Sequence, residues 1–177
     1  MDGRGCAHLS ARGLASWGVL IVAAITSIVA CGGPRATTVP EMAFSTEHVR
    51  MLELVNQARS SATYCGTRGW FPASGPLSLE GRLTAVAQAH TTEMRARGRI
   101  SHTGADGSSV GDRVTRRGYG WSTVGENVAS GFDSPEAVVA GWLASPGHCA
   151  NVMHDRFVHL GVGHEGGYWT QVFARPR

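Results

Sequence analysis

The chain has 177 residues, 42% of them hydrophobic, and its formal net charge is +3 at neutral pH. That length leaves room for one domain with a single core. The small charge excludes a nucleic-acid reader, which would need a concentrated basic stripe with interleaved aromatic side chains. The densest basic run, Arg95, Arg97 and Arg99, lies at the end of an expected helix, where cations complement the helix dipole. We therefore expect no nucleic-acid partner.

The N-terminal segment is expected to be an export signal. Two arginines give a basic start, and residues 13–30 form an uncharged apolar run that is typical of a secretory signal. The run ends in Ile28-Val29-Ala30-Cys31, which resembles a lipobox, since a branched aliphatic residue precedes the cysteine by three positions and a small residue directly precedes it. We predict a lipoprotein signal peptide over residues 1–31, with Cys31 acylated and the mature protein anchored to a membrane.

An uncleaved anchor helix over the same apolar run is the alternative. In either case the remaining chain is exported, as an anchored envelope protein or a secreted one. Residues 32–44 are rich in glycine, proline and threonine and have no apolar period, which predicts a flexible tether. The folded domain is then expected over residues 45–177.

The cysteines fit an oxidising compartment. Cys6 would leave with the signal and Cys31 would carry the lipid, so Cys65 and Cys149 remain in the folded domain. An even pair of cysteines in an exported domain favours a disulfide, whereas two buried free thiols are the alternative.

Apolar positions at helical spacing predict four helices. They are a helix from Ser45 or Thr46 to Ser60, one capped by Ser78 and ending at Gly98, a shorter one over residues 110–117, and one opened by Ser134-Pro135-Glu136.

Alternating patterns predict strands over residues 125–129, 159–164 and 168–174, the last two joined by a hairpin at Glu165-Gly166-Gly167. Helices placed before and between a few late strands indicate an α+β domain.

Five short phrases resemble those of the CAP superfamily, which comprises cysteine-rich secretory, antigen-5 and pathogenesis-related proteins, and the similarity is greatest to its bacterial branch. The resemblance extends over about residues 49–173 and implies a three-layer α-β-α sandwich with a small antiparallel sheet. The phrases are Leu54 to Arg59, Ser101-His102-Thr103, Gly125-Glu126-Asn127, Ser145-Pro146-Gly147-His148 and Tyr168-Trp169-Thr170-Gln171-Val172-Phe173.

The resemblance also implies a cleft lined by His102 and Glu126, two members of a family tetrad. Glu126 lies in a predicted strand, where a carboxylate is unexpected unless it has a partner. The other two members are absent, because Ser145 and Tyr168 stand where animal and plant relatives have glutamate and histidine. We therefore expect Tyr168 to line the cleft in place of the histidine of those relatives.

His148 is a further candidate for the same cleft. Together with His102 it gives two imidazoles, which with one carboxylate and a water form a ligand set that Zn²⁺ accepts. His148 could equally cap a helix or bond a backbone carbonyl. His90 lies on the apolar stripe of the second helix, and is interpreted as a hydrogen-bonded core histidine.

Two functional hypotheses remain. The first is an extracytoplasmic binding or scaffold module whose cleft takes a small apolar, lipid-like or envelope ligand. The second is a zinc-assisted hydrolase of peptide or cell-wall bonds, in which His102 and His148 hold the metal and Glu126 is the general base.

Overall fold

The computed structural model describes residues 43–177. The predicted signal peptide, the lipobox at Cys31 and nearly all of the predicted tether lie outside these residues. Among the helices of residues 43–177, none is long and apolar enough to cross a bilayer.

The helices begin and end close to the predicted positions. Ser45 caps the first with its side chain, and Ser134 caps the fourth, which has Pro135 at its first position as expected. The helices are α1 (Thr46–Arg59), α2 (Gly81–Arg97), α3 (Val110–Arg116), α4 (Pro135–Ala144) and α5 (Pro146–Met153), with a short 3₁₀ turn η1 (Gly66–Arg68).

Four strands form the main sheet in the order β3-β5-β6-β4, and a separate pair, β1 and β2, forms a small ribbon. The long strands pair antiparallel, and β5 turns into β6 through two glycines with positive φ, as the hairpin signal predicts. The strands are β1 (Thr63–Tyr64), β2 (Trp70–Phe71), β3 (Ser78–Leu79), β4 (Trp121–Ser130), β5 (His159–Glu165) and β6 (Tyr168–Pro176).

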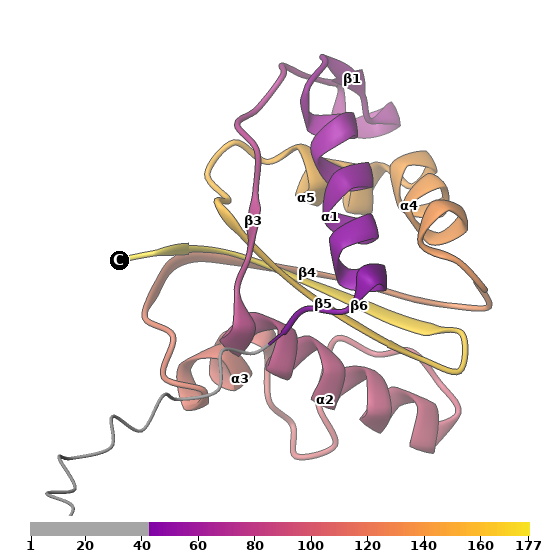
Figure 1. The fold of residues 1–177 in the computed structure, drawn as a ribbon, viewed down its shortest axis with the longest axis vertical. Coiled ribbons are helices and arrows are strands. Elements are labelled where there is room, and N and C mark those ends of the chain that lie inside the picture. Colours follow the sequence, from indigo (N-terminus) through magenta and orange to yellow (C-terminus); the bar gives the residue numbers. More distant parts are fainter. Residues whose placement is uncertain (1–42) are drawn as a thin grey trace, which may run out of the picture. The chain divides into compact units, whose positions relative to one another are not determined.

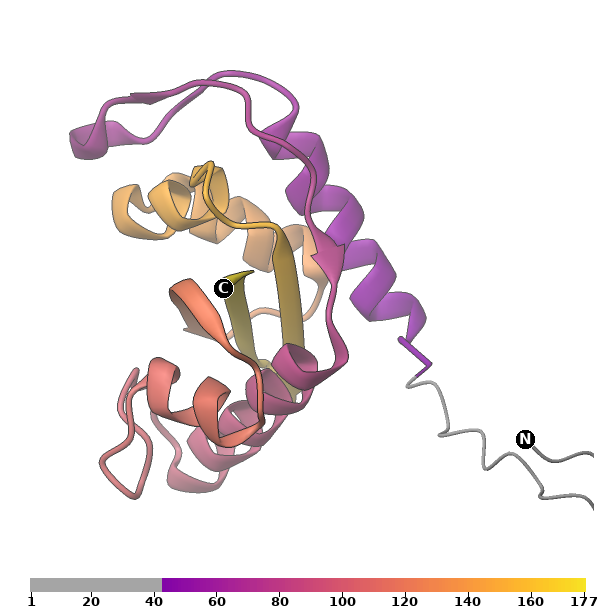
Figure 2. The same ribbon diagram turned by 90° about the vertical axis from the view of Figure 1, so that its left-hand side faces the viewer.

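The sheet lies between two layers of helices, with α1, α4 and α5 on one face and α2 and α3 on the other (Figures 1 and 2). Each face has its own core. Trp142, Trp169 and Phe173 are fully buried in the core between the sheet and helices α1, α4 and α5. Leu83, Val114 and Val172 are buried in the core between the sheet and helices α2 and α3. This arrangement confirms the predicted α+β class and the three-layer sandwich.

One local prediction was wrong and one helix was missed. Ser78 does not cap α2 but belongs to β3, which pairs parallel with β5, and Glu80 is the cap because its carboxylate accepts from the Leu83 N–H at 2.9 Å. The segment from Pro146 to Met153, which was not predicted as a helix, forms α5. Pairing with β5 decides the first case, since β3 has only two residues.

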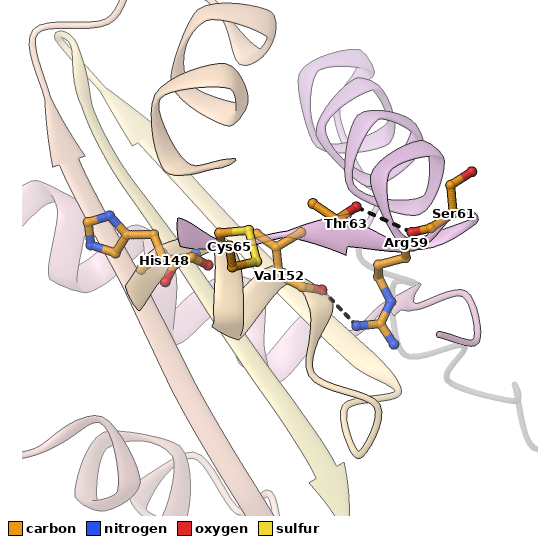
Figure 3. Close-up of a disulfide and its surroundings, with 8 residues drawn as sticks. Arg59, Ser61, Thr63, Cys65, His148 and Val152 are labelled. Atoms are coloured by element: carbon orange, nitrogen blue, oxygen red, sulfur yellow. Dashed lines mark hydrogen bonds between the residues drawn. A yellow bond between two sulfur atoms is a disulfide. The ribbon is translucent and has the colours of Figure 1, made fainter. Parts of the chain in front are cut away.

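The expected disulfide is present. Cys65 and Cys149 are bonded with their Cα atoms 5.5 Å apart, and both residues are almost fully buried. The bridge joins the residue that follows β1, in the connection between β1 and β2, to α5 (Figure 3). The alternative of two free thiols is therefore excluded.

Two glycines of β5 let α2 lie unusually close to the sheet. A Cβ atom added at Gly161 would lie 2.1 Å from the Leu83 carbonyl carbon, and one added at Gly163 would lie 2.5 Å from that of Ala87. Both neighbours are backbone atoms, which cannot rotate away as a side chain can. Because Gly161 and Gly163 have no side chains, α2 can pack directly against the backbone of β5.

We expect Gly161→Ala to lower the free energy of unfolding by about 3 kcal/mol or more, the upper end for overpacked cores. Urea unfolding measures the loss. Gly75→Ala is the matched control, because a Cβ atom there meets nothing within 4 Å. Equal stability of the two variants would contradict the close approach of α2.

Candidate functional site

Glu126 is the centre of the site. It lies in β4 opposite Val172, on the face of the sheet that α2 and α3 cover, and its side chain is only 2% exposed. The His102 Nδ1–H donates to Oε1 at 2.9 Å, and the Arg113 guanidinium donates to Oε2 at 2.6 Å. Both carboxylate oxygens therefore have a cationic or potentially cationic partner.

Arg113 was missed by the sequence analysis. It lies on α3 with its side chain 10% exposed, and also donates to the backbone carbonyls of Ser108 at 2.8 Å and His102 at 3.2 Å. One guanidinium thus holds both Glu126 and the loop that carries His102. A sequence signal existed, because Arg113 follows Val110 by three positions and precedes Val114 on the otherwise apolar face of α3.

His102 and His148 have opposite electrostatic environments. The hydrogen bond to Glu126 raises the pKa of His102, whose side chain is 60% exposed. Burial lowers the pKa of His148, and the positive charge of His102 lowers it further. The site therefore favours a charged imidazole at His102 and a neutral one at His148.

A network of buried amides joins this cluster to α5. Asn127 Nδ2 donates to the His148 carbonyl at 3.2 Å and to Gln171 Oε1 at 3.1 Å. Asn151 Nδ2 donates to Asn127 Oδ1 at 2.9 Å and to the Glu126 carbonyl at 3.1 Å. The Gly-Glu-Asn, Ser-Pro-Gly-His and Thr-Gln phrases are thus physically connected, and His148 lies beside the disulfide (Figure 3).

His90 differs from the expected core histidine. It is buried, and its Nε2–H donates to the Ser101 carbonyl at 2.7 Å, but its Nδ1 has no hydrogen-bond partner. The same Nε2 lies 4.0 Å from Glu126 Oε1. His90 therefore forms the buried wall of the Glu126 cluster instead of a fully hydrogen-bonded part of the core.

The structure does not bring Tyr168 to this cluster. Tyr168 pairs with Ser130 at the hairpin end of β6, whereas Glu126 pairs with Val172. Four residues along a strand span about 13 Å, so Tyr168 lies at the far end of the sheet face. The expectation that Tyr168 lines the cleft rested on the sequence alone. Its distance from Glu126 is decided by the pairing register of β4 and β6, which are far apart in the sequence.

The predicted zinc ligand set is not assembled within residues 43–177. The Glu126 side chain is 2% exposed, each of its oxygens accepts a hydrogen bond, and the Arg113 guanidinium at Oε2 would repel a second cation. His102 donates from Nδ1 to Glu126, which leaves Nε2 as its nitrogen available to a ligand or a metal. Within residues 43–177, no three histidine, cysteine, aspartate or glutamate side chains are grouped in a way that could hold a metal ion. No step of a mechanism is therefore derived through zinc.

We expect Glu126→Gln to lower the pKa of His102, since the raising hydrogen bond and charge are lost, and to raise that of His148, since His102 is then less often charged. NMR titration of the imidazole C–H signals measures both. Histidines outside the cluster serve as the internal control. An unchanged pKa of His102 in the variant would show that Glu126 is not its partner.

The same pKa direction gives a stability profile. Because the folded-state pKa of His102 is raised above 6.5, its contribution to the free energy of unfolding is fully present below pH 6.5 and is lost as pH rises through the folded-state pKa. Solvent screening keeps this contribution small at a side chain that is 60% exposed.

The protein is thus a three-layer sandwich domain. It has a buried carboxylate, Glu126, between the His102 imidazole and the Arg113 guanidinium, and a disulfide that holds α5. The family model described as "CAP: Cysteine-rich secretory protein family" matches residues 52–173. The chain therefore belongs to the CAP family, as the sequence phrases predict.

Two Bacillus subtilis proteins are similar in sequence. The chain is 35% identical over 100 residues to the uncharacterized protein YkwD, covering 55% of this chain and 39% of the relative. It is 33% identical over 90 residues to the uncharacterized membrane protein YlbC, covering 51% of this chain and 26% of the relative. The matched segments thus span well under half of each relative.

Solved structures agree on the fold. An extracellular protein containing an SCP domain from Bacillus anthracis superimposes with a TM-score of 0.64 and 29% identity, covering 73% of this chain and 40% of that one. An outer surface protein from Borrelia burgdorferi has a TM-score of 0.58 at 18% identity, covering 73% and 89% respectively. The second likeness supports the fold alone.

Proposed function

We propose that the protein is an extracytoplasmic binding module, anchored to a membrane by a lipid on Cys31, and that the His102–Glu126 cluster is part of its ligand surface. The burial of Glu126 carries this proposal. A general base must lie within reach of a water or substrate, yet this side chain is 2% exposed and its two oxygens accept hydrogen bonds from His102 and Arg113. The same burial argues against Glu126 as the base of a zinc-assisted hydrolase.

The location outside the cytoplasm rests on independent observations. A disulfide joins Cys65 and Cys149, and such bonds persist mainly in oxidising compartments. One similar structure is described as an extracellular protein. The lipobox supplies the proposed anchor.

The polar part of the binding surface would be His102. Glu126 raises its pKa from inside the protein, and its exposed ring can present a charged Nε2–H to a ligand. Charge-assisted hydrogen bonds to a carboxylate or phosphate are stronger than neutral ones. An anionic or strongly accepting group on the ligand fits this position best.

An apolar ligand has a separate candidate surface, in the helix layer on the other face of the sheet from Glu126 (Figure 1). A cavity of about 260 Å³ lies between α1 and α4. Its lining is mostly aliphatic: Leu54, Gln57, Ala58, Glu136, Val139, Ala140 and Leu143. A short alkyl chain would bury there at about 25 cal/mol for each Å² removed from water.

The proposal is tested with protein beginning at Gly32, which omits the predicted signal. We expect dodecanoate to bind in calorimetry, His102→Ala to weaken that binding, and equimolar Zn²⁺ to leave the histidine NMR signals of the unliganded protein unchanged. Stoichiometric zinc binding that disappears in His102→Ala would overturn the proposal and favour the hydrolase. The absence of dodecanoate binding would remove the apolar ligand class.

A further inference from the structure

Two aromatic side chains stand exposed on the β1–β2 ribbon, away from the cluster around Glu126. Trp70 is 73% exposed and Tyr64 is 59% exposed, higher fractions than those of the other exposed large hydrophobic residues in residues 43–177. Their rings are partners in the ribbon register and pack with centroids 5.5 Å apart. Such a pair leaves much apolar surface in water, which usually marks a binding site.

The ribbon is held firmly despite its exposure. The Cys65 N–H donates to the Gly69 carbonyl at 2.8 Å, and the disulfide ties Cys65 to α5. The end of α5 is in turn fixed by the buried Arg59 guanidinium, which donates to the carbonyls of Val152 at 2.7 Å and His154 at 2.9 Å (Figure 3). The aromatic pair is therefore presented on a preorganised support, which lowers the entropic cost of binding.

A cavity of about 310 Å³ opens beside Trp70, at the lower end of the volumes of small-ligand pockets. Aromatic and apolar side chains line it together with two polar ones. The lining consists of Trp70, Phe71, Pro72, Met153, His154 and Asp155.

The two polar side chains of the lining, those of Asp155 and His154, offer a hydrogen-bond acceptor and a hydrogen-bond donor. The side chain of Asp155 is 80% exposed. The backbone N–H of Arg156 donates to His154 Nδ1 at 3.1 Å, so a neutral His154 carries its proton on Nε2. The lining therefore combines an exposed carboxylate acceptor, whose Oδ1 lies 3.4 Å from His154 Nδ1, with an imidazole N–H donor at Nε2.

We propose that this cavity is a carbohydrate-binding site in which a sugar ring packs on Trp70 and its hydroxyl groups bond to Asp155 and His154. A pyranose has an apolar face of C–H groups and a rim of hydroxyl donors and acceptors. The cavity matches both features, since its lining includes the Trp70 indole as well as a carboxylate and an imidazole.

Two other ligands fit less well. An organic cation would be attracted by Asp155, but that carboxylate already interacts electrostatically with the Arg59 guanidinium, and Arg156 follows it in the chain. A membrane surface would accept Trp70 and Tyr64, but it would also have to desolvate the Asp155 carboxylate at the cavity rim. A neutral polyol avoids both costs.

The test uses chitotetraose and cellotetraose as probes, with protection of Trp70 from iodide quenching as the readout. Within residues 43–177, Trp142 and Trp169 are fully buried and Trp121 is partly buried, so Trp70 is the most exposed tryptophan and dominates the quenching, with Trp70→Ala giving the signal of the others. We expect one of the two oligosaccharides to protect Trp70 and to bind in calorimetry. We expect Trp70→Ala to weaken binding roughly tenfold or more, and Asp155→Asn to weaken it about tenfold.

Ile100→Ala is the matched control, because Ile100 is an exposed apolar residue outside the ribbon, and it should leave sugar binding unchanged. Vesicles of phosphatidylglycerol and phosphatidylcholine form a second arm. A blue shift of Trp70 emission on vesicles without protection by either sugar would overturn the proposal in favour of a membrane contact. Absence of protection by both sugars would overturn it whatever the vesicles do, and would leave the dodecanoate result untouched.

Discussion

Reduction of the Cys65–Cys149 disulfide is expected to lower the free energy of unfolding by about 4.5 kcal/mol, the loop-entropy value for the observed sequence separation of 84. The physical reason is that the bridge removes conformations from the unfolded chain, and a long loop loses more of them. Such a loss is a large part of the total stability of a domain of this size.

Urea unfolding of the oxidised and reduced protein measures the difference without changing any side chain. The matched control is the double variant Cys65→Ala/Cys149→Ala, whose stability should not respond to the reductant. A loss below about 1 kcal/mol in the unaltered protein would contradict the expectation and would indicate that the unfolded chain is already compact.

The parts of the fold that depend on local chemistry were predictable. Ser134-Pro135 starts α4 because a hydroxyl cap and a preset φ act within one turn. The glycines between β5 and β6 likewise form the turn that their positive φ permits. By contrast, β3 is a strand because it pairs with β5. No local sequence pattern predicts a strand of two residues.

The site divides in the same way. His102 and Glu126 are titratable residues in short motifs that could be recognised from the sequence, and the structure does bring their side chains together. Arg113 was overlooked, and His90 was assigned to the core, because both lie on helix faces that otherwise pack into the core, where an apolar role is the ordinary expectation. Tyr168 was misplaced because its distance from Glu126 depends on strand register, which residue order does not reveal.

The second large effect is expected at the buried ion pair. Arg113→Met should lower the free energy of unfolding by about 3–5 kcal/mol, because it leaves the Glu126 carboxylate buried without its strongest partner. Glu126→Leu should cost a similar amount for the opposite reason, since the Arg113 guanidinium is only 10% exposed. Both losses are measured by urea unfolding at one pH.

The double variant Arg113→Met/Glu126→Leu distinguishes a buried pair from two independent residues. Removing both charges together abolishes the desolvation cost that each single variant suffers, so the double variant should be more stable than either single one. Arg50 and Glu136 provide the matched control, with a 2.7 Å contact between side chains that are 47% and 52% exposed. Arg50→Met should cost less than about 1 kcal/mol, because water already solvates that pair. Additive losses at Arg113 and Glu126 would mean that the carboxylate is solvated in solution, and would reopen Glu126 as a base for chemistry.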